Sequence, residues 1–269
     1  MHVEAHCIAS GSSGNAVLIQ AGGQYLLIDA GVGPRILAAA LQRRGVALGN
    51  LCAILLTHEH DDHLKGAPSL SKRLNAPVVA NRATLDAACQ RVELTHVQEL
   101  ASGAEDKFGP FKTRSFRVSH DAAEPVGYVV EVGGTRIAYA TDIGCTSPQL
   151  KQAMSGAQLC ILESNHDLEW LRRGPYPPHM KVRVASDHGH LSNRDAVGAI
   201  AERLEEDGPA TFWLAHLSAV NNSPVFARRY ADTEIKSRTK VAHKVEIALR
   251  DRPSVTWERG AITTQLSLF

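Results

Sequence analysis

One feature limits what this chain can fold into more than any other: an apolar strand that leads directly into a cluster of metal-binding side chains. The strand spans Cys52 to Leu56, and the next residues read Thr57-His58-Glu59-His60-Asp61-Asp62-His63. Continuous apolar strands of this kind are covered on both faces, as in a sheet that lies between other layers. The sequence therefore predicts a layered α/β domain with this polar cluster at the carboxyl end of a buried strand.

The spacing within the cluster predicts two neighbouring metal sites. His58 and His60 are two residues apart on an extended segment, so both imidazoles can point to one side and bind one ion. Asp62 and His63 follow where the chain turns into a helix, and they can bind a second ion nearby. The alternative is a solvated loop with a helix cap, but four candidate ligands within six residues argue against it.

Three later segments repeat the pattern of a polar residue at the end of an apolar strand. The residues are His120, Asp142 and His216, and the predicted strands before them are 111–119, 136–140 and 211–215. A carboxylate such as Asp142 can bridge two ions, and neutral histidine nitrogens suit the outer sides of the pair. For each of the three residues taken alone, a structural role remains an open alternative.

The remaining elements indicate two mixed sheets packed face to face with helices outside. We expect a β-hairpin over 16–29, turning at Gly22-Gly23, and a first helix over 35–44. Further strands are expected at 77–80, 126–132 and 159–162. Further helices are expected at 64–74, 83–90, 148–153, 194–205 and 225–236.

Charge and hydropathy narrow the classes of function. Lys plus Arg number 29 against 28 for Asp plus Glu, so any surface that attracts nucleic acid must be local. No apolar run approaches the length of a membrane span, and the first nine residues lack the pattern of a secretion signal. We therefore expect a cytoplasmic protein with no membrane partner, built as one domain over 1–264 and a tail over 265–269.

The ordered set His58-x-His60-x-Asp62-His63, His120, Asp142 and His216 resembles the metallo-β-lactamase superfamily. Within it, segments 9–15, 120–128, 163–167 and 187–193 are similar to the YycJ/WalJ group, which is linked to DNA exonuclease activity. The resemblance implies a four-layered αββα sandwich of the α/β class with two divalent metal ions, Zn or Mn, or else Fe. It implies one ion on His58, His60, His120 and Asp142, and the other on Asp62, His63, Asp142 and His216.

The resemblance also implies catalytic residues beyond the metal ligands. The Glu163 and His190 segments are similar to the part of related phosphodiesterases, such as RNase Z, where a carboxylate orients a histidine that protonates the leaving group. We assign His190 as general acid, Glu163 as its partner, and Asp62 as a ligand that also bonds the attacking hydroxide. His188, in the same loop, competes with His190 for the acid role, and a buried structural histidine is the plain alternative.

Two loops and a group of cations are candidates for substrate binding. The Ser10–Asn15 loop offers Ser12, Ser13, Asn15 and backbone N–H groups to a phosphate, and Asn222 follows His216. An ordinary tight turn and a helix cap are the respective alternatives. Five cations near the His190 loop suit the backbone of a nucleic acid, or else a solvated face. They are Arg172, Arg173, Lys181, Arg183 and Arg194.

The tail, Gln265-Leu266-Ser267-Leu268-Phe269, resembles the short peptide by which bacterial replication and repair proteins bind the DNA sliding clamp. Its Gln head and Leu-Phe pair suit a polar anchor followed by an apolar pocket. A C-terminal edge strand is the alternative, because Thr264, Leu266 and Leu268 alternate.

Taken together, these features predict a two-metal phosphodiesterase, and most specifically a 5′-directed DNA exonuclease of repair or replication that the sliding clamp recruits. Another hydrolase of the same fold, acting on RNA or a small cyclic phosphodiester, is one alternative. A clamp-binding regulatory module is the other.

Overall fold

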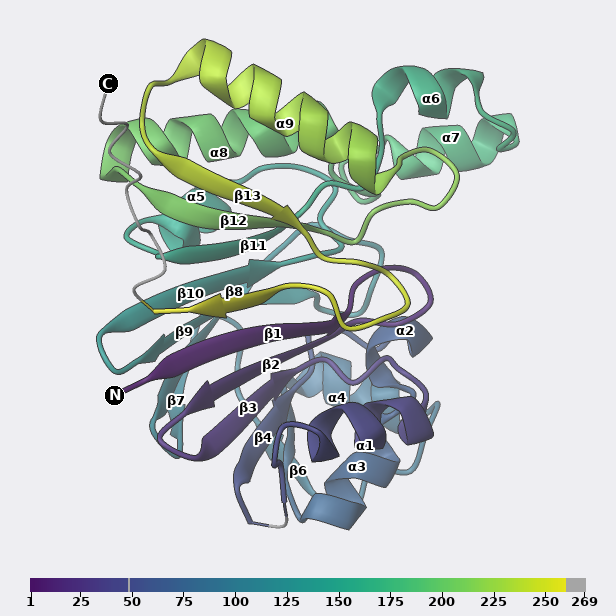
Figure 1. Cartoon of the computed structure of the whole chain (residues 1–269). Coiled ribbons are helices and arrows are strands. Elements are labelled where there is room, and N and C mark those ends of the chain that lie inside the picture. Colours follow the sequence, from purple (N-terminus) through teal and green to yellow (C-terminus); the bar gives the residue numbers. More distant parts are fainter. Residues whose placement is uncertain (48, 260–269) are drawn as a thin grey trace.

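The computed structural model describes residues 1–47 and 49–259, which form two mixed β-sheets packed face to face (Figure 1). In the described residues the first sheet has seven strands, in the order β14 (Thr256–Glu258), β1 (Val3–Ala9), β2 (Ala16–Ala21), β3 (Gln24–Ile28), β4 (Leu51–Leu55), β5 (Val78–Ala80) and β6 (Val97–Glu99). The second also has seven described strands, in the order β13 (His243–Ile247), β12 (Ala210–Ala215), β11 (Leu159–Glu163), β10 (Thr135–Ala140), β9 (Val126–Val132), β8 (Phe111–Arg117) and β7 (Glu105–Phe108).

Helices cover the outer face of each sheet, which gives the four αββα layers that the sequence predicts (Figure 1). The first sheet is covered by α1 (Pro34–Gln42), α2 (Asp61–Leu64), α3 (Ala67–Leu74) and α4 (Arg82–Cys89). The second is covered by α5 (Pro148–Met154), α8 (Asn193–Asp207) and α9 (Pro224–Arg238). Two short helices, α6 (Leu168–Arg173) and α7 (Pro178–Val184), form a lobe at one end of the second sheet.

The core has three apolar clusters, one between the sheets and one under each helical layer. Trp213 and Tyr128 are completely or almost completely buried between the sheets, where they meet side chains of β1, β2 and β3. Every residue of β11 and of β12 is buried. This two-sided burial explains why these strands read as uninterrupted apolar runs.

Parallel strands bring the candidate site residues to one edge of the sandwich. In the first sheet β3 and β4 run parallel, and in the second β10, β11 and β12 run parallel. The carboxyl ends of parallel neighbours lie at the same edge, so residues that follow them meet although they are far apart in the chain.

One of the expected helices is divided in the structure. The helix expected over 64–74 is two helices, α2 and α3, which Lys65 and Gly66 separate. A Cβ at Gly66 would lie 2.6 Å from the carbonyl oxygens of Ala30 and Val32, so only glycine fits where the chain passes this loop.

Several short or polar elements have no counterpart in the sequence prediction. They are β1, β6, β7, α6, α7, β13 and β14. The proposed clamp-binding tail, 265–269, lies outside the described residues. Within the part of the chain that is described, no helix combines the length and the apolar character needed to cross a membrane.

Candidate metal centre

The structure brings all seven predicted ligands together where the two sheets meet. Four overlapping groups have ligand atoms within 4.8 Å of one another. They are His58, His60 and His120; His58, His63 and Asp142; Asp62, His63 and His216; and Asp142, Glu163, His190 and His216. The groups share members, so they form one continuous cluster rather than separate sites.

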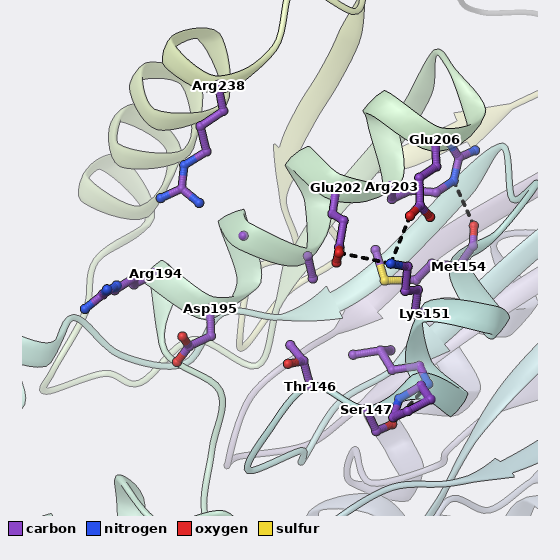
Figure 2. Close-up of a pocket in the computed structure, with 14 residues that line it drawn as sticks. Thr146, Ser147, Lys151, Met154, Arg194, Asp195, Glu202, Arg203, Glu206 and Arg238 are labelled. Atoms are coloured by element: carbon purple, nitrogen blue, oxygen red, sulfur yellow. Dashed lines mark hydrogen bonds and ion pairs between the residues drawn. The ribbon is translucent and has the colours of Figure 1, made fainter.

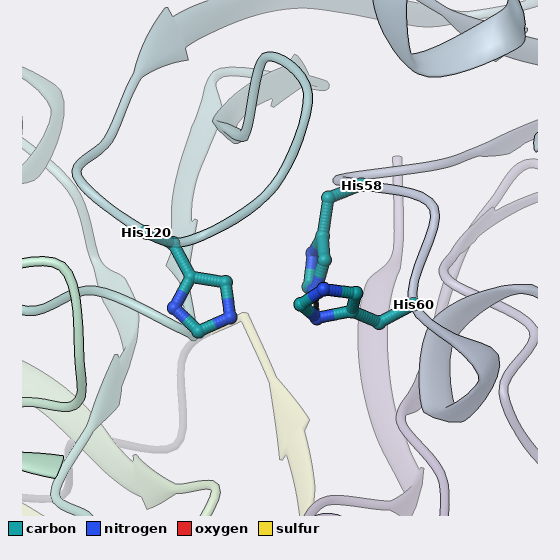
Figure 3. A group of neighbouring side chains, drawn as sticks. All are labelled: His58, His60 and His120. Atoms are coloured by element: carbon teal, nitrogen blue, oxygen red, sulfur yellow. Dashed lines mark hydrogen bonds between the residues drawn. The ribbon is translucent and has the colours of Figure 1, made fainter. Parts of the chain in front are cut away.

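Three histidines on one side of the cluster point toward one another (Figure 3). Nε2 of His58 lies 3.1 Å from Nδ1 of His60. Two nitrogens bound to one zinc ion at about 2.0–2.1 Å are about 3.3 Å apart in a tetrahedral site, so this spacing suits a shared ion. The Nδ1 atom of His120 lies 3.1 Å from the carbonyl oxygen of Gly189, which leaves its Nε2 directed to the same place.

His63 on the other side is held by a buried carboxylate. Its Nδ1 lies 2.8 Å from Oδ2 of Asp29, and both side chains are fully buried. Asp29 also accepts hydrogen bonds from the backbone N–H and hydroxyl of Thr57, at 2.9 and 3.0 Å, and from the hydroxyl of Tyr139 at 3.2 Å. Such a partner fixes the tautomer of a histidine ligand and directs its other nitrogen to the metal. Asp29 is not among the site residues that the sequence predicts, although it follows an apolar strand as the predicted ligands do.

Asp142 lies between the two sides. Its Oδ1 is 3.8 Å from Nε2 of His120, and its Oδ2 is 3.1 Å from Nε2 of His63. Oδ1 also lies 3.4 Å from Nδ1 of His216, so histidines surround both oxygens and the carboxylate is placed to contact more than one ion. Nε2 of His216 is buried and has no hydrogen-bond partner among the described residues, and the same holds for Oδ2 of Asp142 apart from its ion-pair contact with His63. Buried polar atoms of this kind need a partner, and metal ions would satisfy both.

The backbone at the centre is conformationally unusual. Asp29, Asp142 and His216 have φ of 58°, 55° and 52°, and only Asn75 joins them among non-glycine residues of the described chain. The left-handed region costs such residues on the order of 1–3 kcal/mol and persists where the surroundings enforce it. At His216 the backbone N–H donates to the hydroxyl of Ser10 at 2.9 Å. These turns redirect each side chain from the end of its strand into the cluster.

The carboxylates of the cluster favour positive charge beside them. Burial opposes ionisation, yet His216 and His63 hold the pKa of Asp142 well below its usual range. In the other direction, burial opposes protonation of His216, but Asp142, Asp62 and Glu163 raise its pKa to about 10. The carboxylates thus stay ionised and stabilise either protons or metal ions at these nitrogens.

Glu163 connects a predicted metal ligand, His216, with the predicted general acid, His190. Its Oε1 lies 2.8 Å from Nδ1 of His216 and 2.8 Å from Nδ1 of His190. Its Oε2 accepts the backbone N–H of Ile143 at 2.7 Å. The His190 side chain is 22% exposed, so its remaining nitrogen can reach a substrate. Burial opposes its protonation, but Glu163 raises the pKa of His190 and so favours the protonated form that an acid needs.

His188, the competing candidate, has different surroundings. It is exposed, and its Nδ1 lies 3.0 Å from the hydroxyl of Ser119. It belongs to none of the four ligand groups in the described chain. The geometry therefore favours His190 over His188 as the acid.

The four predicted substrate-binding residues fall into two classes. Ser12 and Ser13 are exposed on the loop after β1. Asn15 is fully buried, and its Nδ2 lies 2.9 Å from Nε2 of His63, so it faces the metal cluster. Asn222 differs from the prediction: it is 4% exposed, and its Nδ2 donates to two backbone carbonyls and to Asn193 Oδ1. These hydrogen bonds connect the loop of Asn222 with the segments of Ser164 and Asn193, and they leave its Nδ2 no free hydrogen for a substrate.

A separate cavity of about 540 Å³ lies between α5, α8 and α9 (Figure 2). Its described lining includes Arg194, Arg238 and Lys151, and none of the seven predicted ligands. This cavity is therefore separate from the predicted metal cluster.

Comparisons with known proteins identify the family and the fold of the chain. Residues 24–217 match the protein-family model described as Beta-lactamase superfamily domain. The chain is 37% identical to exodeoxyribonuclease YycJ of Bacillus anthracis, over 82% of this chain and 84% of that protein. It is 34% identical to exodeoxyribonuclease WalJ of Streptococcus pneumoniae, over 80% and 81% of the two chains. The metallo-β-lactamase fold protein YhfI from Bacillus subtilis superposes with a TM-score of 0.70 at 19% identity, over 96% of this chain and 99% of that one.

The matches confirm the family, the αββα fold and the enzyme class that the sequence predicts, a metal-dependent hydrolase. The chain therefore belongs to the metallo-β-lactamase superfamily, within the group that contains YycJ and WalJ.

Proposed function

We propose that this protein is a two-metal phosphodiesterase that degrades DNA from the 5′ end. The observation that carries the proposal is the single cluster of seven ligands with the Glu163–His190 pair at its edge. The relatives named exodeoxyribonuclease, YycJ and WalJ, support DNA as the substrate. A role in repair or replication belongs to the same proposal.

The charge of the cluster supports two ions rather than one. Asp29, Asp62, Asp142 and Glu163 carry four formal negative charges, which two divalent ions would neutralise. Nitrogen and carboxylate donors in this mixture suit Zn or Mn, with Fe as a further candidate. When bound, such ions generate a hydroxide near neutral pH and offset charge on the attacked phosphoryl group.

The protein's own groups provide the rest of the chemistry. Asp62 lies beside His63 and His216, where its carboxylate can also accept a hydrogen bond from the nucleophile. His190, oriented by Glu163, protonates the leaving oxygen. An acid beside the metals favours a phosphodiester over a lactam or a thioester. RNA or a small cyclic phosphodiester remains the second candidate substrate.

The direct test is a nuclease assay on labelled single-stranded and double-stranded DNA and RNA, with and without a 5′ phosphate, across a series of metals. We expect nucleotides to be released from the 5′ end of DNA, and Asp62→Ala to abolish this release and to bind fewer than two ions per chain. Metal content and thermal unfolding of the variant show whether the fold survives. Cleavage of RNA alone would contradict the choice of substrate, and a fully active Asp62→Ala would contradict the site.

Replacing the acid should separate chemistry from metal binding. We expect His190→Ala to keep both ions and to cleave DNA about 10²–10⁴-fold more slowly, as is usual when a general acid is lost. His188→Ala is the matched control and should retain most of the activity. If the rate fell for His188→Ala and not for His190→Ala, the two assignments would have to be exchanged.

The tail provides the recruitment part of the proposal. A peptide of residues 265–269 should bind the sliding clamp in the micromolar range, or about 8 kcal/mol, mostly through Leu268 and Phe269. Deleting the five residues should leave cleavage of short free DNA unchanged and remove stimulation by clamp loaded on longer DNA. If the tail instead forms an edge strand, deleting it should lower the melting temperature of the protein. Clamp affinity that is the same with and without the tail would rule out docking.

A further inference from the structure

We propose that Arg183 on α7 binds the DNA phosphate that neighbours the phosphate at the metals. Until DNA binds, Asp121 keeps Arg183 in place. This inference rests on the proposed function, because it requires a substrate with more than one phosphate. It assigns a substrate-binding residue outside the metal cluster and its acid.

The last turn of α7 packs against the loop that carries His190, beside the metal cluster. The backbone N–H of His190 donates to the carbonyl of Val184 at 2.9 Å. A Cβ on Gly189 would lie 2.2 Å from the carbonyl oxygen of Arg183, so the two segments pack backbone to backbone. The carbonyl of Gly189 in turn contacts Nδ1 of His120. The last turn of α7 is therefore fixed against both the acid and a predicted ligand.

A single carboxylate, that of Asp121, lies between Arg183 and the metal cluster. Its Nε donates to Oδ2 of Asp121 at 2.8 Å. The other oxygen of Asp121, Oδ1, lies 3.3 Å from Nε2 of His120, the nitrogen that faces the cluster. Asp121 thus stands between the guanidinium and the place where the attacked phosphate would bind, and it directs Arg183 toward that place.

A phosphate can replace Asp121 as the partner of Arg183. The side chains of Arg183 and Asp121 are 64% and 35% exposed, and exposed ion pairs of this kind contribute little to stability. The planar guanidinium matches two phosphate oxygens as well as it matches a carboxylate. No residue is buried in the described segment 174–188, so the surface beside Arg183 is open to a polynucleotide strand.

The other predicted cations have different surroundings. Arg172 and Arg173 lie 2.9 and 3.2 Å from Glu169 on α6, and Nζ of Lys181 donates to the carbonyl of Arg172 at 2.8 Å. Arg194 lines the separate cavity between α5, α8 and α9 (Figure 2). Of these five cations, Arg183 is the one that the structure directs to the metal cluster.

A purely structural ion pair would behave differently from a phosphate-binding residue. If the pair only fastened α7, removing either partner would have the same effect. If Arg183 binds DNA and Asp121 competes with DNA for it, the two substitutions have opposite effects on affinity. Arg183→Ala should weaken binding, while Asp121→Asn should strengthen it because the cation stays and its competitor is lost.

The experiment measures KM and kcat of the metal-loaded, full-length enzyme on single-stranded DNA over a series of salt concentrations. We expect Arg183→Ala to raise KM about 5- to 10-fold, with a smaller effect on kcat, and Asp121→Asn to lower KM. The slope of log(1/KM) against log[salt] should become shallower by about 0.7 in Arg183→Ala, as for one lost contact with a single-strand phosphate. Metal content of each variant shows whether the centre is still loaded.

The matched control is the pair Arg228 and Asp232 on α9, where Nε also lies 2.8 Å from Oδ2 and the side chains are 45% and 34% exposed. Arg228→Ala and Asp232→Asn should leave KM unchanged. An active wild type in which Arg183→Ala and Asp121→Asn raise KM alike, or in which neither differs from the control variants, would overturn this inference alone. A wild type with no activity on DNA would overturn the proposed function and this inference with it.

Discussion

Four carboxylates lie within one histidine cluster where the two sheets meet, and compensation of their charge is the constraint on which the rest of the site depends. Asp29 and Glu163 are fully buried, and Asp142 is nearly so. Buried carboxylates are costly unless they are paired or bind metal ions. Each of them contacts a histidine nitrogen, which leaves the opposite nitrogen of that ring, or the second carboxylate oxygen, directed into the cluster.

Both halves of the chain contribute to this arrangement. The first sheet contributes Asp29 and the segment after β4, and the second contributes Asp142, Glu163 and His216 from successive strand ends. Glu163 has a special place because one of its oxygens contacts both His216 and His190. The orientation of a predicted ligand and that of the proposed acid therefore depend on the same carboxylate.

Much of this site follows from local sequence patterns, because a polar residue at the end of an apolar strand has a defined place in a layered fold. His58, His60 and His63 could be found in this way, and their spacing with Asp62 predicts two sites, while the full ligand set of each ion came from the family resemblance. Asp29 was missed because a single aspartate after a hairpin also reads as a turn residue. The role of Asn222 depends on contacts with Ser164 and Asn193, which no local pattern encodes.

The same limit applies to the fold. The buried strands β4, β11 and β12 could be predicted from their apolar runs, whereas β6 and β7 are largely exposed and polar and carry no such signal. The strand β1 contains Glu4 and His6, which interrupt its apolar pattern, and its three-residue partner β14 is too short to recognise. Their pairing joins the two ends of the described chain and becomes visible only in three dimensions.

Anomalous diffraction from crystals of the metal-loaded protein tests the central claim most directly, because it locates the ions without reference to activity. The account predicts two separate peaks, both within bonding distance of Asp142, one beside His58, His60 and His120 and the other beside Asp62, His63 and His216. A single peak, or two peaks that do not share Asp142, would contradict it.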